Sequence, residues 1–290
     1  MSRDRANPMK DAMLQDALHA FQCRVRQSEV KAANIAVTVA STPVCVVGAT
    51  KLTRVLRSRI APYQGDWVPN LLGPPAMMHL RDEEPRSLRF ADVRERRRAL
   101  LEAAHMQPLT NHVRQLRARL GTEIPDFDPL DGGIDARVLF LFEKPGPMTS
   151  AASQTRAGSG FISRNNDDPS AEATHMFMRT AGLARTETIS WNVIPGWNGT
   201  VKVTAAELRE GAALIDEVVR MLPRLEAIVF VGRKAERARR YLDRLPVKFF
   251  SSAHPSPKVR SIMRAKWDAI PEQWSAVREF LNQSRTDPAS

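Results

Sequence analysis

Four short runs rich in β-branched and aromatic residues alternate with helical segments in the second half of the sequence. The runs span residues 136–142, 188–193, 227–231 and 247–251. Strands that alternate with helices favour right-handed β-α-β units and a mainly parallel sheet with helices on both faces. The sequence therefore predicts a three-layer α/β/α fold around a four-stranded, mainly parallel sheet, with a helical N-terminal extension.

Local signals mark the ends of the helices. Thr204-Ala205-Ala206-Glu207 is a capping box, and Gly182 closes the preceding helix, which is expected at 168–181. Thr110 is expected to cap a helix that stops at Gly121. Further helices are predicted at 233–242 and, outside the sheet, at 271–281.

The first 107 residues are expected to form a basic, partly helical region of unknown role, and residues 108–290 the domain that holds the sheet. An amphipathic helix is predicted around 13–25, whereas the apolar segment 37–47 has no assignment. Four arginines, Arg94, Arg96, Arg97 and Arg98, follow one another closely. Such a run is typical of a solvated helix face.

Charge points to a polyanionic partner. The chain has 43 Lys and Arg against 32 Asp and Glu, a formal net charge of +11, which favours a nucleic acid. The absence of a glycine-rich phosphate loop disfavours a small-molecule nucleotide enzyme.

Two cysteines, Cys23 and Cys45, exclude a Cys-based iron–sulfur cluster, a zinc knuckle and a disulfide framework within the chain. They also favour a reducing compartment. The apolar stretch 35–49 is interrupted by Pro43 and is shorter than the roughly 20 residues of a spanning helix. We expect a monomer associated with the cytoplasmic nucleoid, without membrane, metal or cofactor.

A polar residue lies at the end of three of the four predicted strands, with a proline one to three positions further on. Glu143 follows the first strand, Asn192 ends the second and His254 follows the last. Ligands of open α/β sheets bind beyond the carboxyl ends of the strands. These three side chains are therefore predicted around one pocket.

At these positions the chain resembles the uracil-DNA glycosylase superfamily. The motifs are Phe142-Glu143-Lys144-Pro145-Gly146, Gly160-Phe161, Asn192 and His254-Pro255-Ser256-Pro257. Their order and spacing resemble the branch with a Gly-Glu-Ala-Pro-Gly motif, over about 109–281. The resemblance implies an enzyme that flips a base out of DNA, hydrolyses its N-glycosidic bond and leaves an abasic site.

The chain departs from that branch at two places near the base pocket. Lys144 stands where a small residue is expected, and the segment 163–169 is more polar than its counterpart. The missing cluster cysteines imply a member without iron–sulfur. The base is thus expected to be uracil, as in DNA repair, or a modified pyrimidine, up to a bulky glucosylated hydroxymethylcytosine in phage defence.

The reaction builds positive charge on the sugar, so a carboxylate is expected beside it to stabilise the charge and orient water. The resemblance gives this role to Glu143, which could instead pair with Lys144. Asn166, Asp167 or Asp168 could activate water in its place. Asp168 precedes Pro169, a pattern that also predicts a helix N-cap.

The resemblance assigns three residues to the base. His254, as a neutral imidazole, would donate a hydrogen bond to the base carbonyl that gains charge. Asn192 would read the pyrimidine edge with its amide. Phe161 would stack on the base, and its alternative is an ordinary core aromatic.

The segment after the His-Pro-Ser motif is expected to contact DNA. It offers cations for phosphates and apolar side chains for insertion into the duplex, and the residues are Lys258, Arg260, Met263 and Arg264. An ordinary basic loop entering a helix is the alternative.

Two other activities stay open. The glycosylase fold could serve as a DNA-binding module that no longer catalyses. The Lys144 amine could form a Schiff base with the abasic sugar, which would add lyase activity.

Overall fold

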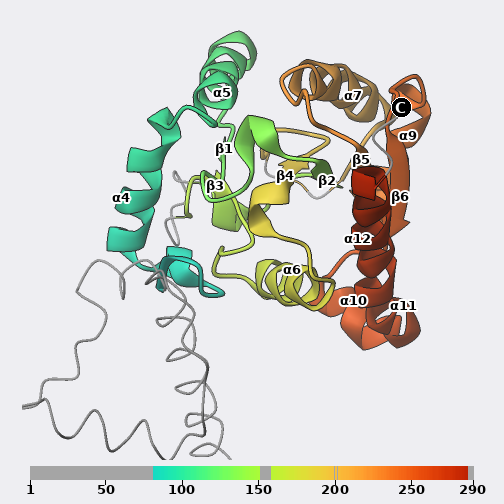
Figure 1. Ribbon diagram of the computed structural model, residues 1–290. Helices are drawn as coiled ribbons and strands as arrows, with labels where there is room; N and C mark the ends of the chain where they lie inside the picture. Colours follow the sequence, from blue (N-terminus) through green and yellow to red (C-terminus); the bar gives the residue numbers. More distant parts are fainter. Residues whose placement is uncertain (1–80, 151–157, 199, 201, 287–290) are drawn as a thin grey trace, which may run out of the picture. The chain divides into compact units, whose positions relative to one another are not determined.

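The central sheet of the computed structural model has four parallel strands in the order β4-β2-β5-β6 (Figure 1). Their bounds are β2 (Val138–Phe142), β4 (Thr188–Asn192), β5 (Ala227–Val231) and β6 (Lys248–Ser252). Phe142 pairs with Asn192 across β2 and β4, which brings the ends of these strands together. The predicted parallel sheet is confirmed.

The structure describes residues 81–150, 158–198, 200 and 202–286. The helix predicted around 13–25 and the apolar segment 37–47 lie outside the described residues. We predict a domain boundary after residue 107; the described residues 81–107 lie in the same compact unit as the sheet. Within the described part, no helix has the length and apolar character needed to cross a membrane.

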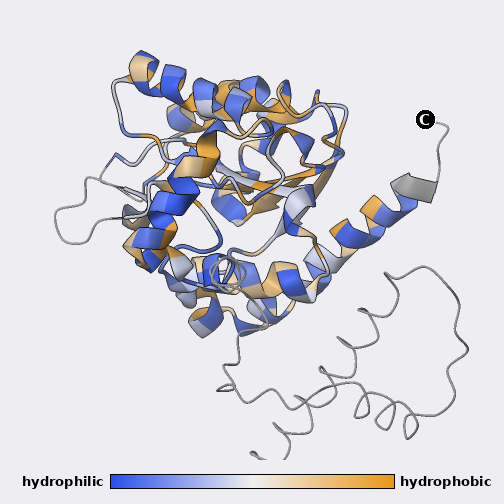
Figure 2. Cartoon of the chain, turned by 60° about the vertical axis from the view of Figure 1, so that its left-hand side comes forward, coloured by the Kyte–Doolittle hydropathy of each residue, from blue (hydrophilic) through white to orange (hydrophobic). Residues whose placement is uncertain are grey.

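Helices cover both faces of the sheet, as predicted. Alternate strand residues point to opposite faces, so Leu139 and Leu141 enter one core and Val138 and Phe140 the other. The first core contains α5 (Gln107–Leu120), α7 (Ala205–Val219), α8 (Arg233–Glu236) and α9 (Arg239–Leu242). The second contains α6 (Pro169–Thr180) and α12 (Ile270–Thr286). In Figure 2 the hydrophobic residues gather on the strands and on the helix faces turned toward them.

The remaining elements are short. They are η1 (Ser87–Arg89), α4 (Ala91–Ala99), η2 (Leu100–Glu102), β1 (Asp126–Phe127), η3 (Gly133–Asp135), η4 (Pro147–Thr149), β3 (Phe161–Ile162), η5 (Arg185–Glu187), α10 (Pro257–Ile262) and α11 (Arg264–Asp268). β1 and β3 pair in a second, two-stranded parallel sheet.

The predicted helix signals are partly confirmed. The capping box of Thr204 and Glu207 is present at α7, and Gly121 ends α5 at φ 60°. Thr110 is not the N-cap of α5, because the helix begins at Gln107 and the Thr110 hydroxyl donates to the Leu101 carbonyl at 2.8 Å. The helix expected at 233–242 is divided into α8 and α9.

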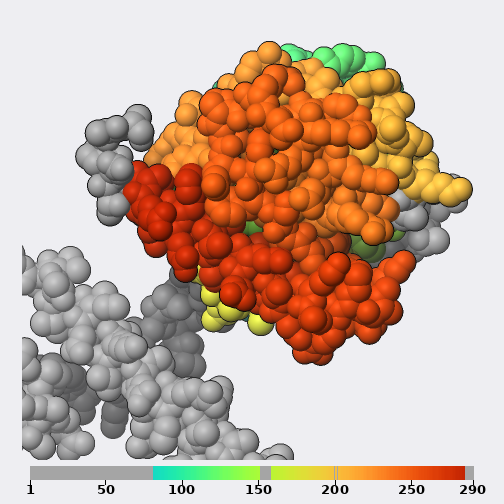
Figure 3. All heavy atoms as spheres, turned by 90° about the vertical axis from the view of Figure 1, so that its right-hand side faces the viewer, coloured from blue at the N-terminus to red at the C-terminus, as the bar shows by residue number. Residues whose placement is uncertain are grey.

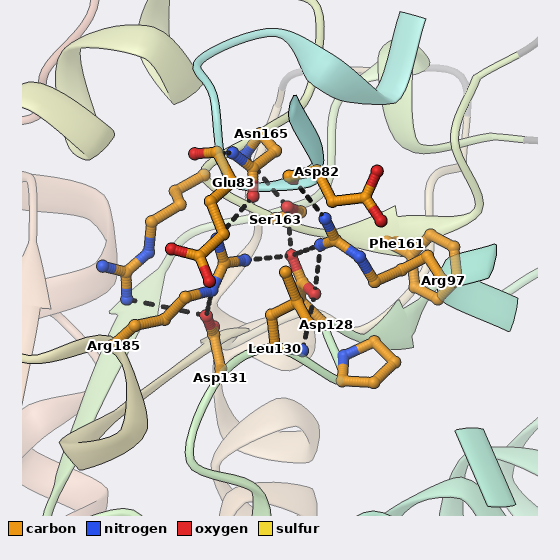
Figure 4. Close-up of polar contacts among 12 residues, drawn as sticks. Asp82, Glu83, Arg97, Asp128, Leu130, Asp131, Phe161, Ser163, Asn165 and Arg185 are labelled. Carbon is orange, nitrogen blue, oxygen red and sulfur yellow. Dashed lines mark hydrogen bonds and ion pairs between the residues drawn. The ribbon is translucent and has the colours of Figure 1, made fainter. Parts of the chain in front are cut away.

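The prediction of a solvated arginine face is wrong at Arg97, which is 1% exposed. Its Nη1 donates to both carboxylate oxygens of Asp128, at 2.5 and 2.6 Å. Arg185 Nη2 donates to the same carboxylate at 2.6 Å, and its Nε lies 3.1 Å from Asp131 Oδ1 (Figure 4). Burial alone would raise the pKa of Asp128, but the charges of Arg185 and Arg97 lower it below its usual range.

This buried network also fixes the loop of residues 163–166. Asn165 donates from Nδ2 to the carbonyls of Glu83 and Glu84 at 3.0 and 2.7 Å. The Ser163 hydroxyl donates to Asp128. Segments far apart in sequence therefore hold residues 163–166 in one conformation (Figure 4).

Candidate active site

A cavity of about 420 Å³ opens beyond the carboxyl ends of the central strands. Phe142 from β2, Ser190 and Asn192 from β4, and His254 after β6 contribute to its wall. The rest of the wall comes from the loop 144–149 and from residues of the segment 162–174. Parallel strands bring these residues to one edge of the sheet, where ligands of such folds bind.

His254 is held against the end of β5 and β2. Its ring meets that of Phe142 edge to face, with centroids 5.8 Å apart. Gly232 has φ 91°, and a Cβ added there would lie 3.0 Å from the His254 Cβ, so a glycine is required beside the histidine. This close approach fixes the ring at the cavity wall.

The imidazole of His254 is kept neutral. Burial lowers its pKa below the ordinary value, the Lys234 charge adds to this effect, and the Glu143 carboxylate opposes it. Nδ1 is buried and has no hydrogen-bond partner in the described part of the chain. A neutral ring can donate one hydrogen bond to a ligand.

Two side chains of β4 offer polar groups to the cavity. Asn192 is 3% exposed, and within the described residues its amide has no hydrogen-bond partner. The Ser190 hydroxyl is likewise buried and without a partner there. A buried polar group that lacks a partner is destabilising by about 1–3 kcal/mol, so the Ser190 hydroxyl is suited to bind a ligand, and the Asn192 amide is available to one.

Glu143 does not lie on the cavity wall, although sequence analysis predicted it near the reacting sugar. Its Oε1 accepts a hydrogen bond from Lys234 Nζ at 2.8 Å. Its partner is thus Lys234 and not Lys144. The carboxylate affects the cavity only indirectly, because its negative charge raises the pKa of His254.

The three residues predicted to activate water in its place differ in position. Asn166 reaches the cavity, but its amide donates to the Phe161 carbonyl at 2.9 Å and accepts from the Ser159 hydroxyl at 2.6 Å. Asp167 lies in a small neighbouring recess, 3.4 Å from Arg86 Nη1. Asp168 lies on the cavity wall and also caps α6, as its position before a proline predicted.

Phe161 does not lie where it could stack on a base in the cavity, contrary to the prediction. The ring is 1% exposed and packs with Leu88 and Val93, and it is not part of the cavity wall. Neighbouring residues of a strand point to opposite sides, so Ile162 faces the cavity instead. The aromatic ring on the wall is that of Phe142.

Lys144 contributes to the wall with its stem, but its ammonium is directed elsewhere. Nζ donates to Asn198 Oδ1 at 2.9 Å, to the carbonyls of Thr200 and Lys202 at 3.4 and 3.0 Å, and to Glu207 Oε1 at 2.9 Å. These hydrogen bonds occupy the amine and connect the loop that follows β2 to α7. This placement disfavours the Schiff-base hypothesis.

The segment expected to contact DNA forms two short helices, α10 and α11. Ser256 caps α10 by accepting from Val259 N. Ile262 and Met263 are 64% and 39% exposed at the junction of the helices. The predicted cations are exposed around them, namely Lys258, Arg260 and Arg264. The face drawn in Figure 3 consists largely of the orange and red segments of the C-terminal third.

Sequence analysis missed Ser190 as a wall residue and placed Arg164 only within the polar segment 163–169 near the base pocket. Ser190 precedes Asn192 by two positions on the same strand and so faces the same side, a signal that was available. Arg164 is buried at 6% exposure and donates to the Thr188 hydroxyl at 2.5 Å, while its Nε has no hydrogen-bond partner in the described chain. Nothing local predicts such a position.

Comparisons with known proteins add no family: no family model matches the chain, and no curated protein matches it. Among the described residues, no group of three or more His, Cys, Asp or Glu side chains could hold a metal ion. The site consists of a neutral imidazole, an unpaired amide, a carboxylate and an aromatic ring. Such a set can bind a polar ring, stabilise charge on its carbonyl and orient water.

Proposed function

We propose that the protein is a DNA glycosylase that flips an altered pyrimidine out of DNA and hydrolyses its N-glycosidic bond. One observation carries the proposal: His254, Asn192 and Asp168 share the wall of one cavity at the carboxyl ends of the strands. The motifs that resemble the uracil-DNA glycosylase superfamily supply two of the three. The product is an abasic site in DNA and a free base.

The base is held by the side chains that lack partners. The Asn192 amide presents donors and an acceptor to the pyrimidine edge, and discrimination follows because a mispaired buried amide is unfavourable. Neutral His254 donates to the base carbonyl, on which charge grows as the bond breaks. The Phe142 ring supplies an apolar surface beside them.

DNA is bound through charge and insertion. The net charge of +11 favours association with phosphates. Ile262 and Met263 project at the junction of α10 and α11, directly after the motif that carries His254. Apolar side chains in such a position can enter the base stack and help to extrude the target.

A second candidate function is favoured by the size and polarity of the cavity. A cavity of roughly 150 Å³ suffices for benzene, and the volume here is about 420 Å³. The cavity wall includes Ser190 and Arg164, whose Oγ and Nε have no hydrogen-bond partner among the described residues. We infer that the base carries a polar substituent of about the size of a ring, such as the glucose of glucosylated hydroxymethylcytosine, as in defence against phage.

The test uses labelled DNAs that carry uracil, a thymine mismatch, hydroxymethylcytosine or glucosylated hydroxymethylcytosine, with alkali to reveal abasic sites. We expect cleavage of at least one, and a loss of roughly 10²- to 10³-fold in the His254→Ala protein, with affinity for abasic DNA retained. If no DNA is cleaved while all are bound, the protein is a binding module and the proposal fails.

A variant separates the two candidate substrates. Ser190→Val keeps a residue suited to a strand but removes the hydroxyl and narrows the cavity. We expect it to lose glucosylated substrate more than unsubstituted pyrimidine. Equal effects on both would contradict the second candidate.

A further inference from the structure

The proposed reaction requires a carboxylate close to the sugar, and this inference rests on that proposal. The departing base takes an electron pair, the sugar becomes cationic, and water must reach C1′. A negative group at the cavity stabilises the cation and accepts a hydrogen bond from the water. The question is which carboxylate of the chain occupies that place.

Two of the three acidic candidates are directed away from the cavity. Glu143 pairs with Lys234 at 2.8 Å and Asp167 lies 3.4 Å from Arg86, and neither lies on the cavity wall. Asp168 does lie on it. Among the described residues of the wall it is the one carboxylate, and it shares the cavity with Asn192 and His254.

The two oxygens of Asp168 have different surroundings. Oδ1 accepts hydrogen bonds from the backbone N–H groups of Ser170 and Ala171 at 2.8 and 2.9 Å. No described residue donates a hydrogen bond to Oδ2. One oxygen therefore fixes the carboxylate at the start of α6, and the other can accept from a water molecule.

At the start of α6 the pKa of the Asp168 carboxyl lies above its ordinary value, because burial outweighs the groups that lower it. Burial raises the pKa of Asp168, whereas the hydrogen bonds from Ala171 and Ser170 and the charge of Arg86 lower it. α6 has 12 residues, and the positive end of its dipole also stabilises an anion. A carboxylate with a raised pKa is a better proton acceptor than an exposed one.

We propose that Asp168 is the catalytic carboxylate of this site, which orients the attacking water and stabilises the cationic sugar. The bond between C1′ and the base nitrogen breaks, and its electron pair leaves with the base. The water oxygen forms a bond to C1′ and passes one proton to Asp168. That proton is then transferred to the departed base, so Asp168 is regenerated, and the products are a sugar hydroxyl and a neutral base.

The competing role is that of a helix cap alone, and two variants separate the roles. Asn and Ser cap helices about as well as Asp, but neither carries a negative charge. Asp168→Asn and Asp168→Ser should therefore keep the thermal stability of the wild type. We expect single-turnover base release on the best DNA of the panel to fall roughly 10²- to 10⁴-fold, with abasic-DNA affinity unchanged.

Glu172→Gln is the matched control. It removes a negative charge from the first turn of the same helix, where Glu172 pairs with Arg86 at 2.8 Å away from the cavity wall. We expect nearly wild-type turnover. The pH profile gives a second readout, because the acid limb due to Asp168 should vanish in Asp168→Asn.

The outcomes are distinct. Near wild-type turnover in both Asp168 variants, with His254→Ala inactive, would overturn the role of Asp168 and leave the glycosylase proposal standing. A wild-type protein that cleaves none of the DNAs would overturn both. Loss of turnover accompanied by unfolding in Asn and Ser variants alike would show that Asp168 serves the fold and not the reaction.

Discussion

The ammonium of Lys144 lies 2.9 Å from Glu207 Oε1, while Glu207 at the same time closes the capping box of Thr204. The Lys144 side chain is 2% exposed. This contact connects the loop after β2, which lines the cavity, to the first turn of α7. The backbone bond from Thr204 and the bond from Lys144 lower the pKa of Glu207 to about 2.

Lys144→Met should therefore destabilise the fold and loosen the cavity loop. Hydrogen bonds to charged groups contribute about 1.5–3 kcal/mol, and we expect a loss of that order in urea unfolding. The exposed Lys202 provides the control, since Lys202→Met should change stability by less than about 0.5 kcal/mol. A Lys144→Met protein as stable as the wild type would contradict a stabilising role for the contact between Lys144 and Glu207.

Lys144 should also fail to form a covalent intermediate. Its Nζ is held by hydrogen bonds to side chains and carbonyls of the loop before α7 and of α7 itself, so it is not free to attack the sugar. We expect no borohydride-trapped adduct with abasic DNA. An adduct that disappears in Lys144→Met would show that lyase chemistry is present after all.

Removal of Arg97 should be among the most destabilising single changes in the described part. Arg97→Met leaves Asp128 buried with one fewer cation, and breaking a buried pair is destabilising by about 3–5 kcal/mol. Urea unfolding measures the loss. Arg98→Met, one position along the same helix and exposed, is the control and should have little effect.

The pKa of His175, a residue of α6, should report the positive charge of the arginines around it. Burial and the charges of Arg164, Arg185 and Arg179 lower its pKa to about 4, and Glu83 lines the same recess. The pKa is lower in the folded state than in the unfolded chain. Stability from neutral His175 is thus complete above about pH 6.5 and is lost as the pH falls through about 4.

Two measurements check this. NMR titration of the His175 ring should show a midpoint near 4 that rises in Arg179→Gln. The difference in unfolding free energy between the wild type and His175→Gln should shrink between pH 7 and pH 4. A midpoint near the ordinary histidine value would contradict the field described here.

Met263 and Ile262 should matter for duplex DNA and not for single strands. Replacing both by Ala removes the groups that enter the stack, while single-stranded substrate needs no extrusion. We expect base release from duplex to fall at least tenfold and release from single strands to stay unchanged. Leu120→Ala, which removes an exposed apolar residue of α5, is the control.

Strong local signals made most of the fold predictable. Three strands of the central sheet, β2, β4 and β5, combine β-branched and aromatic residues over five positions, and β6 holds two adjacent phenylalanines. Asp168 before Pro169 predicted a helix N-cap, and the structure confirms it. The side that Phe161 faces was not predictable, because β3 has two residues and gives no periodicity. Arg97 was misjudged because its partner Asp128 lies 31 positions away, where no local pattern reaches.

The buried network around Asp128 also determines how far the protein can be shortened from its N-terminal side. A recombinant fragment that starts at residue 108 would contain the whole central sheet and the cavity, yet it would lack Arg97 and the carbonyls of Glu83 and Glu84 that bind Asn165. The loop that carries residues 163–168 would lose its anchor on one side. The shortest fragment expected to retain the site must therefore begin before Asp82, whose carbonyl accepts from Arg97 Nη2 at 2.7 Å.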